Sequence, residues 1–282
     1  MEGGLSMKFG TLVRITDISQ VNKKFSDLKE LGFEACQLVY KPKEYYKNDA
    51  MIIKDAAERN GIDISAQFCG YNDNYTIWDL YYGFNTAGLN VEAYRASRLD
   101  YVCKASEFAS WLGVSDIVIH AGFTPNNPFS PGYASMLTAI KIISHHCEKL
   151  GLNVLLETGA EAPVTLLRLI EDVGHNNLFI NFDPANIIMY GYGNPVDAIT
   201  VFGKYIRNIH GKDGMLPTTT RNLGIEMVAG KGMVDFAKIF KMIKDIGYDR
   251  YIIIEREIAG DQQVKDIVAA KKYFEKLWEN AP

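Results

Sequence analysis

The chain has 282 residues, of which 48% are hydrophobic and 23% are charged, as expected for a globular protein with a sizeable core. Its formal net charge of −4 argues against the basic surface that nucleic-acid binding requires, so we expect no nucleic-acid partner. No apolar stretch approaches the roughly 20 residues that cross a bilayer, and the four cysteines form no CxxC pair. We therefore expect a cytoplasmic protein with no membrane partner.

The N-terminal segment, MEGGLSMKFG, lacks the basic region followed by an apolar core that marks a secretory signal. We interpret Met7 as the natural start of the protein, with residues 1–6 as an added remnant.

Short apolar runs alternate with helix-sized segments along the whole chain. Eight runs are predicted as strands: Phe9–Ile15, Ala35–Tyr40, Ile64–Phe68, Ile117–Ile119, Val154–Leu156, Leu178–Phe182, Tyr205–Ile209 and Tyr251–Ile254. Each is followed by a segment that is predicted as a helix: about Ser19–Leu31, Glu44–Asn60, Val91–Leu112, Gly132–Leu150, Pro163–Val173, Pro195–Gly203, Val234–Ile246 and Gln262–Trp278. Glycine repeatedly follows the last helical residue, as is typical of helix C-termini.

Strict alternation of strands and helices fits either a doubly wound open sheet or a closed (β/α)8 barrel. Eight complete units in this length favour the barrel. The first strand ends in Arg14-Ile15-Thr16 and not in the GxGxxG of a dinucleotide-binding sheet. No linker or low-complexity segment divides the chain. We predict an α/β protein with a single (β/α)8 TIM-barrel domain over residues 1–282.

The last four predicted strands all end at a residue that can bind a metal: Glu157, Asp183, His210 and Glu255. Because the carboxyl ends of barrel strands open on one mouth, these side chains are expected to share one cavity. Three carboxylates and an imidazole held together repel one another unless a positive charge compensates them. Oxygen-rich ligands with one histidine suit Mn²⁺, Co²⁺, Mg²⁺ or Zn²⁺. We predict one divalent metal site; four separate helix caps and salt bridges are the alternative.

Several segments give the chain a resemblance to a known family. LLETGAE, NFDPAN, NIHGKDG, GKGMVDF and YIIIERE are similar to segments of the xylose-isomerase-like TIM barrels, the sugar phosphate isomerase/epimerase superfamily. In that family a Glu, an Asp, a His and a Glu from the last four strands hold the metal. The resemblance places these ligands at Glu157, Asp183, His210 and Glu255. Many relatives carry His three residues after the Asp, where this chain has Asn186, an amide that cannot carry a proton near neutral pH.

The resemblance implies a metal-dependent isomerase or epimerase that acts on a sugar or sugar phosphate. Glu157 and Glu255 are the predicted catalytic acid–base pair, which would transfer a proton through an enediolate. A keto-inositol dehydratase would use the same enediolate. An endonuclease IV-like metal phosphodiesterase, which needs more histidines and a basic surface, is a further alternative, as is a non-catalytic sugar-binding barrel.

Four residues near the predicted mouth are candidates for substrate binding: His120, Asn186, Lys212 and Glu226. His120 ends the fourth strand, where a plain packed histidine is an equally good interpretation. Lys212 either meets a phosphate or an oxyanion or lies free on the rim. The aromatic loop Tyr71–Asn90 is suited to stack on a sugar ring or to contact a partner subunit. The sequence is therefore also compatible with a homo-oligomer.

Overall fold

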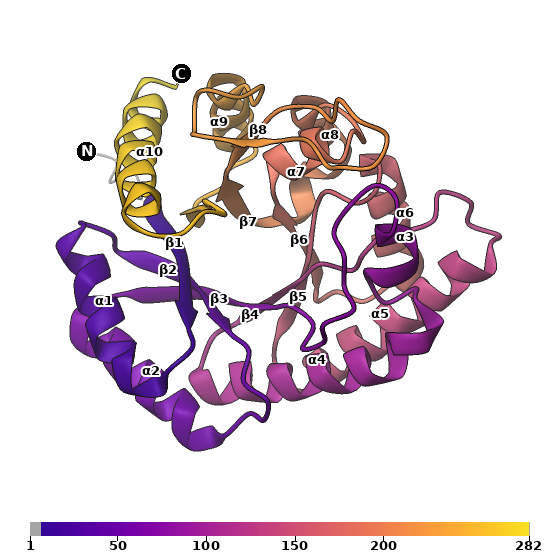
Figure 1. Cartoon of the computed structure of the whole chain (residues 1–282), viewed down its shortest axis with the longest axis horizontal. Helices are drawn as coiled ribbons and strands as arrows, with labels where there is room; N and C mark the ends of the chain where they lie inside the picture. Colours follow the sequence, from indigo (N-terminus) through magenta and orange to yellow (C-terminus); the bar gives the residue numbers. More distant parts are fainter. Residues whose placement is uncertain (1–6, 282) are drawn as a thin grey trace.

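The chain folds into a closed barrel of eight parallel strands surrounded by helices (Figure 1). A computed structural model describes residues 7–281. The strands follow one another around the barrel in the order β1-β10-β7-β6-β5-β4-β3-β2. The barrel strands are β1 (Lys8–Ile15), β2 (Ala35–Tyr40), β3 (Asp63–Cys69), β4 (Asp116–Ile119), β5 (Asn153–Glu157), β6 (Leu178–Phe182), β7 (Ile206–Gly211) and β10 (Tyr251–Ile254). This confirms the predicted (β/α)8 barrel, while residues 1–6 lie outside the described residues.

The helices cover the outside of the barrel and connect consecutive strands. They are α1 (Val21–Glu30), α2 (Lys47–Asn60), α3 (Gly83–Thr86), α4 (Glu92–Leu112), α5 (Pro131–Lys149), α6 (Pro163–Val173), α7 (Pro184–Met189), α8 (Pro195–Phe202), α9 (Phe236–Asp245) and α10 (Asp261–Asn280), with short 3-10 turns η1 (Ile18–Gln20) and η2 (Gly203–Tyr205). The C-terminal helix α10 contacts β1 and β10, so the two ends of the barrel sequence meet (Figure 1).

Burial on both faces explains why the strands read as continuous apolar runs. All six residues of β2 and all four of β4 are buried, because side chains fill the barrel on one face and helices cover the other. Glycine ends helices as the sequence predicted: Gly61, Gly113 and Gly174 follow α2, α4 and α6 in the left-handed conformation.

Two segments that were predicted as loops contain regular structure. The polar cluster after β6 begins a short helix, α7, because the Asp183 carboxylate caps it by accepting a hydrogen bond from the Asn186 backbone N–H. The long connection after β7 contains a two-stranded antiparallel hairpin of β8 (Asp213–Gly214) and β9 (Glu226–Met227). Neither feature changes the order of the barrel strands.

A buried carboxylate fixes the backbone of the connection after β7 through hydrogen bonds. Asp213 is 1% exposed and accepts hydrogen bonds from the backbone N–H groups of Gly230, Gly232 and Val234. A Cβ atom at Gly232 would lie 2.2 Å from the Asp213 Oδ1, so only glycine fits at this position. The GKGMVDF segment is therefore a structural motif that closes the loop.

Arg98 on α4 anchors the long loop that follows β3. Its guanidinium is 1% exposed, forms an ion pair of 2.8 Å with Asp73, and donates to the carbonyl oxygens of Thr86 and Gly88. The loop crosses toward the connection after β7, where the Leu80 N–H donates to the Arg221 carbonyl over 2.7 Å (Figure 1). This loop thus has a buried polar anchor that apolar patterning does not reveal.

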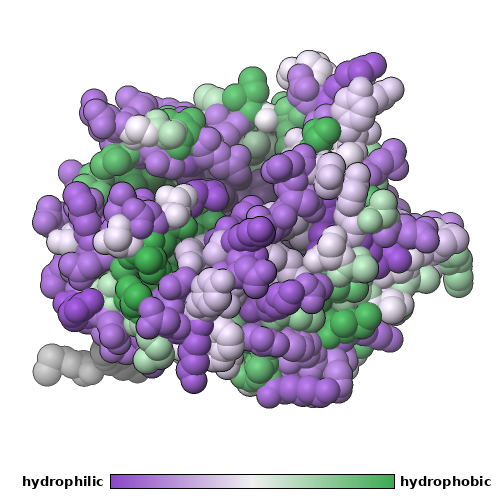
Figure 2. Space-filling model, turned by 60° about the horizontal axis from the view of Figure 1, so that its bottom comes forward, coloured by the Kyte–Doolittle hydropathy of each residue, from purple (hydrophilic) through white to green (hydrophobic). Residues whose placement is uncertain are grey.

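Within residues 7–281, no helix combines the length and the apolar composition needed to cross a membrane. The face in Figure 2 is mostly hydrophilic, with small hydrophobic patches around a central hollow.

Candidate metal centre and substrate cavity

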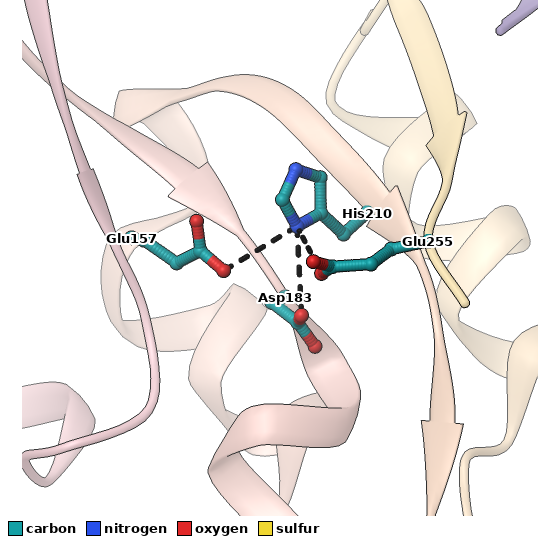
Figure 3. A group of neighbouring side chains, drawn as sticks. All are labelled: Glu157, Asp183, His210 and Glu255. Carbon is teal, nitrogen blue, oxygen red and sulfur yellow. Dashed lines mark ion pairs between the residues drawn. The ribbon is translucent and has the colours of Figure 1, made fainter. Parts of the chain in front are cut away.

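The four residues predicted as metal ligands converge at the carboxyl ends of β5, β6, β7 and β10 (Figure 3). One side-chain ligand atom from each of Glu157, Asp183, His210 and Glu255 lies within 4.8 Å of the other three. The Nδ1 atom of His210 lies in their midst, 3.1 Å from the Glu255 carboxylate, 3.4 Å from that of Glu157 and 3.5 Å from that of Asp183.

None of these three contacts is a hydrogen bond in its geometry. Among the described residues, the His210 Nδ1 and the Asp183 Oδ2 have no hydrogen-bond partner, although both residues are 0% exposed. Buried polar atoms without partners are rare, because leaving one unsatisfied costs about 1–3 kcal/mol. Atoms that face a common point without bonding one another are the arrangement expected of ligands to an ion.

A layer of side-chain amides inside the barrel orients His210. Its Nε2 atom lies 2.9 Å from the Oε1 of Gln37 and 3.1 Å from the amide nitrogen of Asn181, and its Nδ1 faces the carboxylates. Asn208 and Gln37 in turn both donate to the Oδ1 of Asn181. When Nε2–H donates to Gln37, the Nδ1 lone pair is left for a metal, which is the form in which a neutral imidazole acts as a ligand.

The carboxylates are also held in place by neutral neighbours. Asn186 and Asn181 donate to the two oxygens of Glu157 over 3.1 and 3.2 Å, respectively. The Oδ1 of Asp183 caps α7, which leaves Oδ2 directed at His210. Asn186 thus contacts a predicted ligand directly, in the position where a histidine was expected from the resemblance.

Lys212 supplies buried positive charge behind the cluster. It is 2% exposed, and its Nζ lies 2.7 Å from Glu257, 3.4 Å from Glu255 and 3.8 Å from Asp183. Burial alone would lower the pKa of Lys212, but these carboxylates outweigh it and raise the pKa well above its usual range. Lys212 therefore stays charged and offsets part of the negative charge of the cluster.

The pKa values of the cluster show that it attracts further positive charge. Burial raises the pKa of Glu157 to about 7, and Glu255 and Asp183 push it in the same direction while His210 opposes them. Burial would lower the pKa of His210, yet the Glu157 and Glu255 carboxylates raise it well above its usual value. Three carboxylates and one buried ammonium leave net negative charge, which fits a divalent cation.

A cavity of about 400 Å³ opens directly on this cluster. Its wall includes Glu157, Glu255 and Asn186 from the cluster, together with His120 and Trp78. The burial of His120 lowers its pKa to about 3, and nearby Lys212 acts in the same direction, so the ring is neutral. Its Nδ1 accepts from the Gly122 N–H, which places the proton on Nε2, an atom without a partner among the described residues. His120 therefore presents a free donor at the cavity.

The remaining two substrate-binding candidates lie outside the lining of this cavity. Lys212 is engaged by carboxylates behind the cluster and is not a free rim lysine. Glu226 lies on β9, where it pairs with Arg256 over 2.8 Å and accepts from the Glu257 N–H over 2.9 Å. Their direct contact with a substrate stays a prediction.

The amides Gln37, Asn181 and Asn208 are site residues that sequence reasoning missed. They interrupt the apolar runs ACQLVY, LFINF and IRNIH, and all three are at most 2% exposed. A polar residue inside a strand that is otherwise buried is the signal that could have found them.

Glu161 is a second buried acid next to the site, and it gives a testable pH dependence. It is 3% exposed, and burial raises its pKa to about 8 despite a hydrogen bond from the Thr124 hydroxyl. Because this pKa lies above the ordinary glutamate value of 4.5, the fold favours the protonated acid. The contribution of protonated Glu161 to the free energy of unfolding is therefore fully present below about pH 4.5. It is lost as the pH rises toward 8.

We expect the substitution Glu161→Gln to remove this loss of stability. At about 1.4 kcal/mol per pKa unit, the wild type should lose on the order of 3 kcal/mol more than the variant between pH 6 and pH 9. Urea unfolding at both pH values measures the difference. Glu171→Gln, a change of an exposed residue on α6, is the control that should follow the wild type. Parallel curves for Glu161→Gln and the wild type would contradict the assignment.

Comparison with known proteins gives the same fold. Residues 25–277 match the xylose isomerase-like TIM barrel family. A xylose isomerase domain protein from Planctomyces limnophilus is 31% identical, covers 98% of both chains and superposes with a TM-score of 0.89. A D-tagatose 3-epimerase-like protein is 23% identical over 97% of both chains, with a TM-score of 0.72, which shows a shared fold.

One relative with a partial match is named for a different reaction, a dehydration. Inosose dehydratase from Lacticaseibacillus casei is 24% identical over 161 residues, which are 50% of this chain and 53% of that protein. The match to the family covers most of the chain, and the barrel observed here is the fold of that family. The chain therefore belongs to the xylose isomerase-like TIM barrel family.

Proposed function

We propose that the protein is a divalent-metal-dependent isomerase or epimerase of a sugar, working by proton transfer. The observation that carries this proposal is the convergence of Glu157, Asp183, His210 and Glu255 within 4.8 Å of one another beside a cavity of about 400 Å³. A cavity of this size suits a small molecule. The similarity to a D-tagatose 3-epimerase-like barrel supports a sugar as that molecule.

A divalent cation held by these four residues would polarise the carbonyl and an adjacent hydroxyl of a bound sugar and acidify the C–H between them. Glu157 ends β5 and Glu255 follows β10, and these strands are separated in the barrel by β6 and β7, so the two carboxylates reach the cavity from different sides. In the proposal, one carboxylate removes the proton to give an enediolate. The same or the other carboxylate then returns a proton, which shifts the carbonyl or inverts the carbon.

Other residues of the cavity would bind and orient the sugar. The free Nε2–H of His120 is suited to a sugar hydroxyl, and Trp78, whose ring centre lies 4.2 Å from that of His120, offers an aromatic face. Asn186 donates a hydrogen bond to the Glu157 carboxylate, and its amide neither gains nor loses a proton near neutral pH. Proton transfer is therefore assigned to the two glutamates alone.

The experiment that tests this function is a substrate screen in D₂O followed by proton NMR. Ketoses, aldoses and their phosphates are incubated with the protein and Mn²⁺, Co²⁺ or Mg²⁺. We expect turnover of at least one sugar, with deuterium incorporated at the isomerised or epimerised carbon. Turnover without deuterium uptake would indicate a hydride shift and would overturn the proton-transfer mechanism.

A second candidate function is the dehydration of a keto-inositol. The match to inosose dehydratases over half of the chain favours it, and loss of water can follow from the same proton removal. Keto-inositols therefore belong in the same screen. A product lighter by one water molecule, with no activity on ketoses or aldoses, would replace the isomerase assignment by this one.

A further inference from the structure

Two positively charged side chains, Arg14 and Lys41, line the substrate cavity on the side of β1 and β2. Both are exposed, and neither has an ion pair or a side-chain hydrogen bond among the described residues. The site residues described above, Glu157, Asp183 and His210, lie at the carboxyl ends of β5, β6 and β7. In the barrel order, β1 and β2 lie opposite β5 and β6. The two cations are therefore placed across the mouth from most of the metal cluster.

The strand register brings these two side chains to one face. Leu12 pairs with Gln37 and Arg14 with Val39 on the adjacent parallel strands β1 and β2. Gln37 points into the barrel, where it contacts His210, and side chains alternate between faces. Arg14 in β1 and Lys41, directly after β2, continue that inward face toward the mouth. Two long side chains so placed can reach one ligand.

The end of β3 helps to position Lys41. A Cβ atom at Gly70, directly after β3, would come within 2.9 Å of the Lys41 Nζ. The Lys41 ammonium therefore lies over the end of β3 beside the cavity. Partial desolvation of its ammonium at the cavity wall lowers the pKa of Lys41, and the charge of Arg14 lowers it further, because the two cations repel each other.

The carboxylates that line the same cavity have partners of their own. Asp73 is paired with the buried Arg98 and also accepts from the Thr76 hydroxyl. Glu257 is paired with Lys212, and Glu255 belongs to the metal cluster. Arg14 and Lys41 thus form a pair of adjacent cations without a salt-bridge partner among the described residues, and Asp73 attracts Lys41 only from a longer distance.

We propose that Arg14 and Lys41 form a subsite for a phosphate group at the end of the sugar remote from the reacting carbons. This inference rests on the proposed function and names its substrate class, a sugar phosphate. A phosphate monoester carries close to two negative charges at neutral pH, which matches two cations, and the guanidinium fork suits its oxygens. An anion between the two side chains also relieves their mutual repulsion.

The first test measures binding and does not depend on turnover. Inorganic phosphate, a ketopentose 5-phosphate and a sugar acid are titrated calorimetrically into the full-length protein at low salt. We expect the ketopentose phosphate to bind at least tenfold more weakly to Arg14→Gln and to Lys41→Gln. Lys43→Gln, which removes an exposed lysine outside this cavity, should bind like the wild type. Equal binding by all variants, or a preference for the sugar acid, would overturn the phosphate subsite.

The second test measures selectivity with a ketopentose and its 5-phosphate as a pair. The wild type should have the higher kcat/KM for the phosphate, and Arg14→Gln should reduce the ratio of the two values at least tenfold. An unchanged ratio refutes the subsite while leaving the isomerase function intact. Phosphate binding through Arg14 and Lys41 with no turnover of any sugar refutes the proposed function while leaving the subsite intact. Because both side chains are exposed, the variants should fold, and circular dichroism checks this.

Discussion

Replacing either Glu157 or Glu255 by glutamine should lower kcat by a factor of about 100 to 10,000, the range in which a positioned proton-transfer group contributes. Glutamine keeps the size of the side chain and a neutral oxygen that can still face a metal ion, but its amide cannot accept the substrate proton. Asp183 and His210 are poorer candidates for the base. A short aspartate that also caps α7 has little reach, and the free Nδ1 of His210 is directed at the other ligands.

The measurement is turnover of the substrate identified in the screen, together with metal content and the melting temperature of each variant. Glu275→Gln on α10 makes the same change far from the cavity and should retain wild-type turnover. A role of Glu157 and Glu255 in proton transfer requires that turnover falls while each variant stays folded and retains some metal. Turnover of either variant within tenfold of the wild type would remove that residue from the acid–base pair.

The second large effect concerns His210. We expect His210→Asn to weaken the binding of Mn²⁺ or Co²⁺ by roughly 100-fold or more, because an amide oxygen is a weaker donor than a neutral imidazole nitrogen. The asparagine amide takes the place of Nδ1 and loses the contact of Nε2 with Gln37, which costs folding about 1 kcal/mol, less than the expected loss in metal binding. Isothermal titration with each metal and thermal melts with and without metal measure the two effects separately.

The rise in melting temperature on adding metal gives an independent readout. A ligand that binds only the folded state stabilises it in proportion to the logarithm of its concentration over the Kd. The wild type should therefore gain stability with Mn²⁺, and His210→Asn should gain little. His175→Asn, which changes a histidine paired with Glu148 outside the cluster, is the matched control. Metal affinity equal to that of the wild type in His210→Asn would exclude this imidazole from the ligand set.

The arrangement of the cluster explains why a single barrel can combine metal binding with proton transfer. Lys212 lowers the repulsion among the carboxylates from behind, while the cavity leaves Glu157 and Glu255 accessible from the front. For Glu255, burial would raise the pKa, but Lys212 and His210 outweigh it and hold the pKa well below its usual range. The two glutamates thus lie in different environments, although the sequence places them at equivalent strand ends.

Local patterning was enough to predict the barrel and the four side chains at its mouth. Each strand is a short apolar run with a helix-sized segment after it, and the period of the pattern follows from local backbone geometry. A polar residue directly after such a run must lie at the carboxyl end of its strand, whatever the rest of the fold. Glu157, Asp183, His210 and Glu255 could therefore be identified together, and the structure brings them within 4.8 Å of one another.

Contacts between distant segments were decided by the tertiary structure alone. Gln37 orients His210 across 173 residues of sequence, and Arg98 anchors Asp73 across 25. The burial of Lys212 likewise arises only when the ends of β6, β7 and β10 come together around it. The sequence shows that these side chains are polar, but it cannot show which atoms they meet. Their partners depend on how the barrel closes and on the register of its strands, which no local pattern encodes.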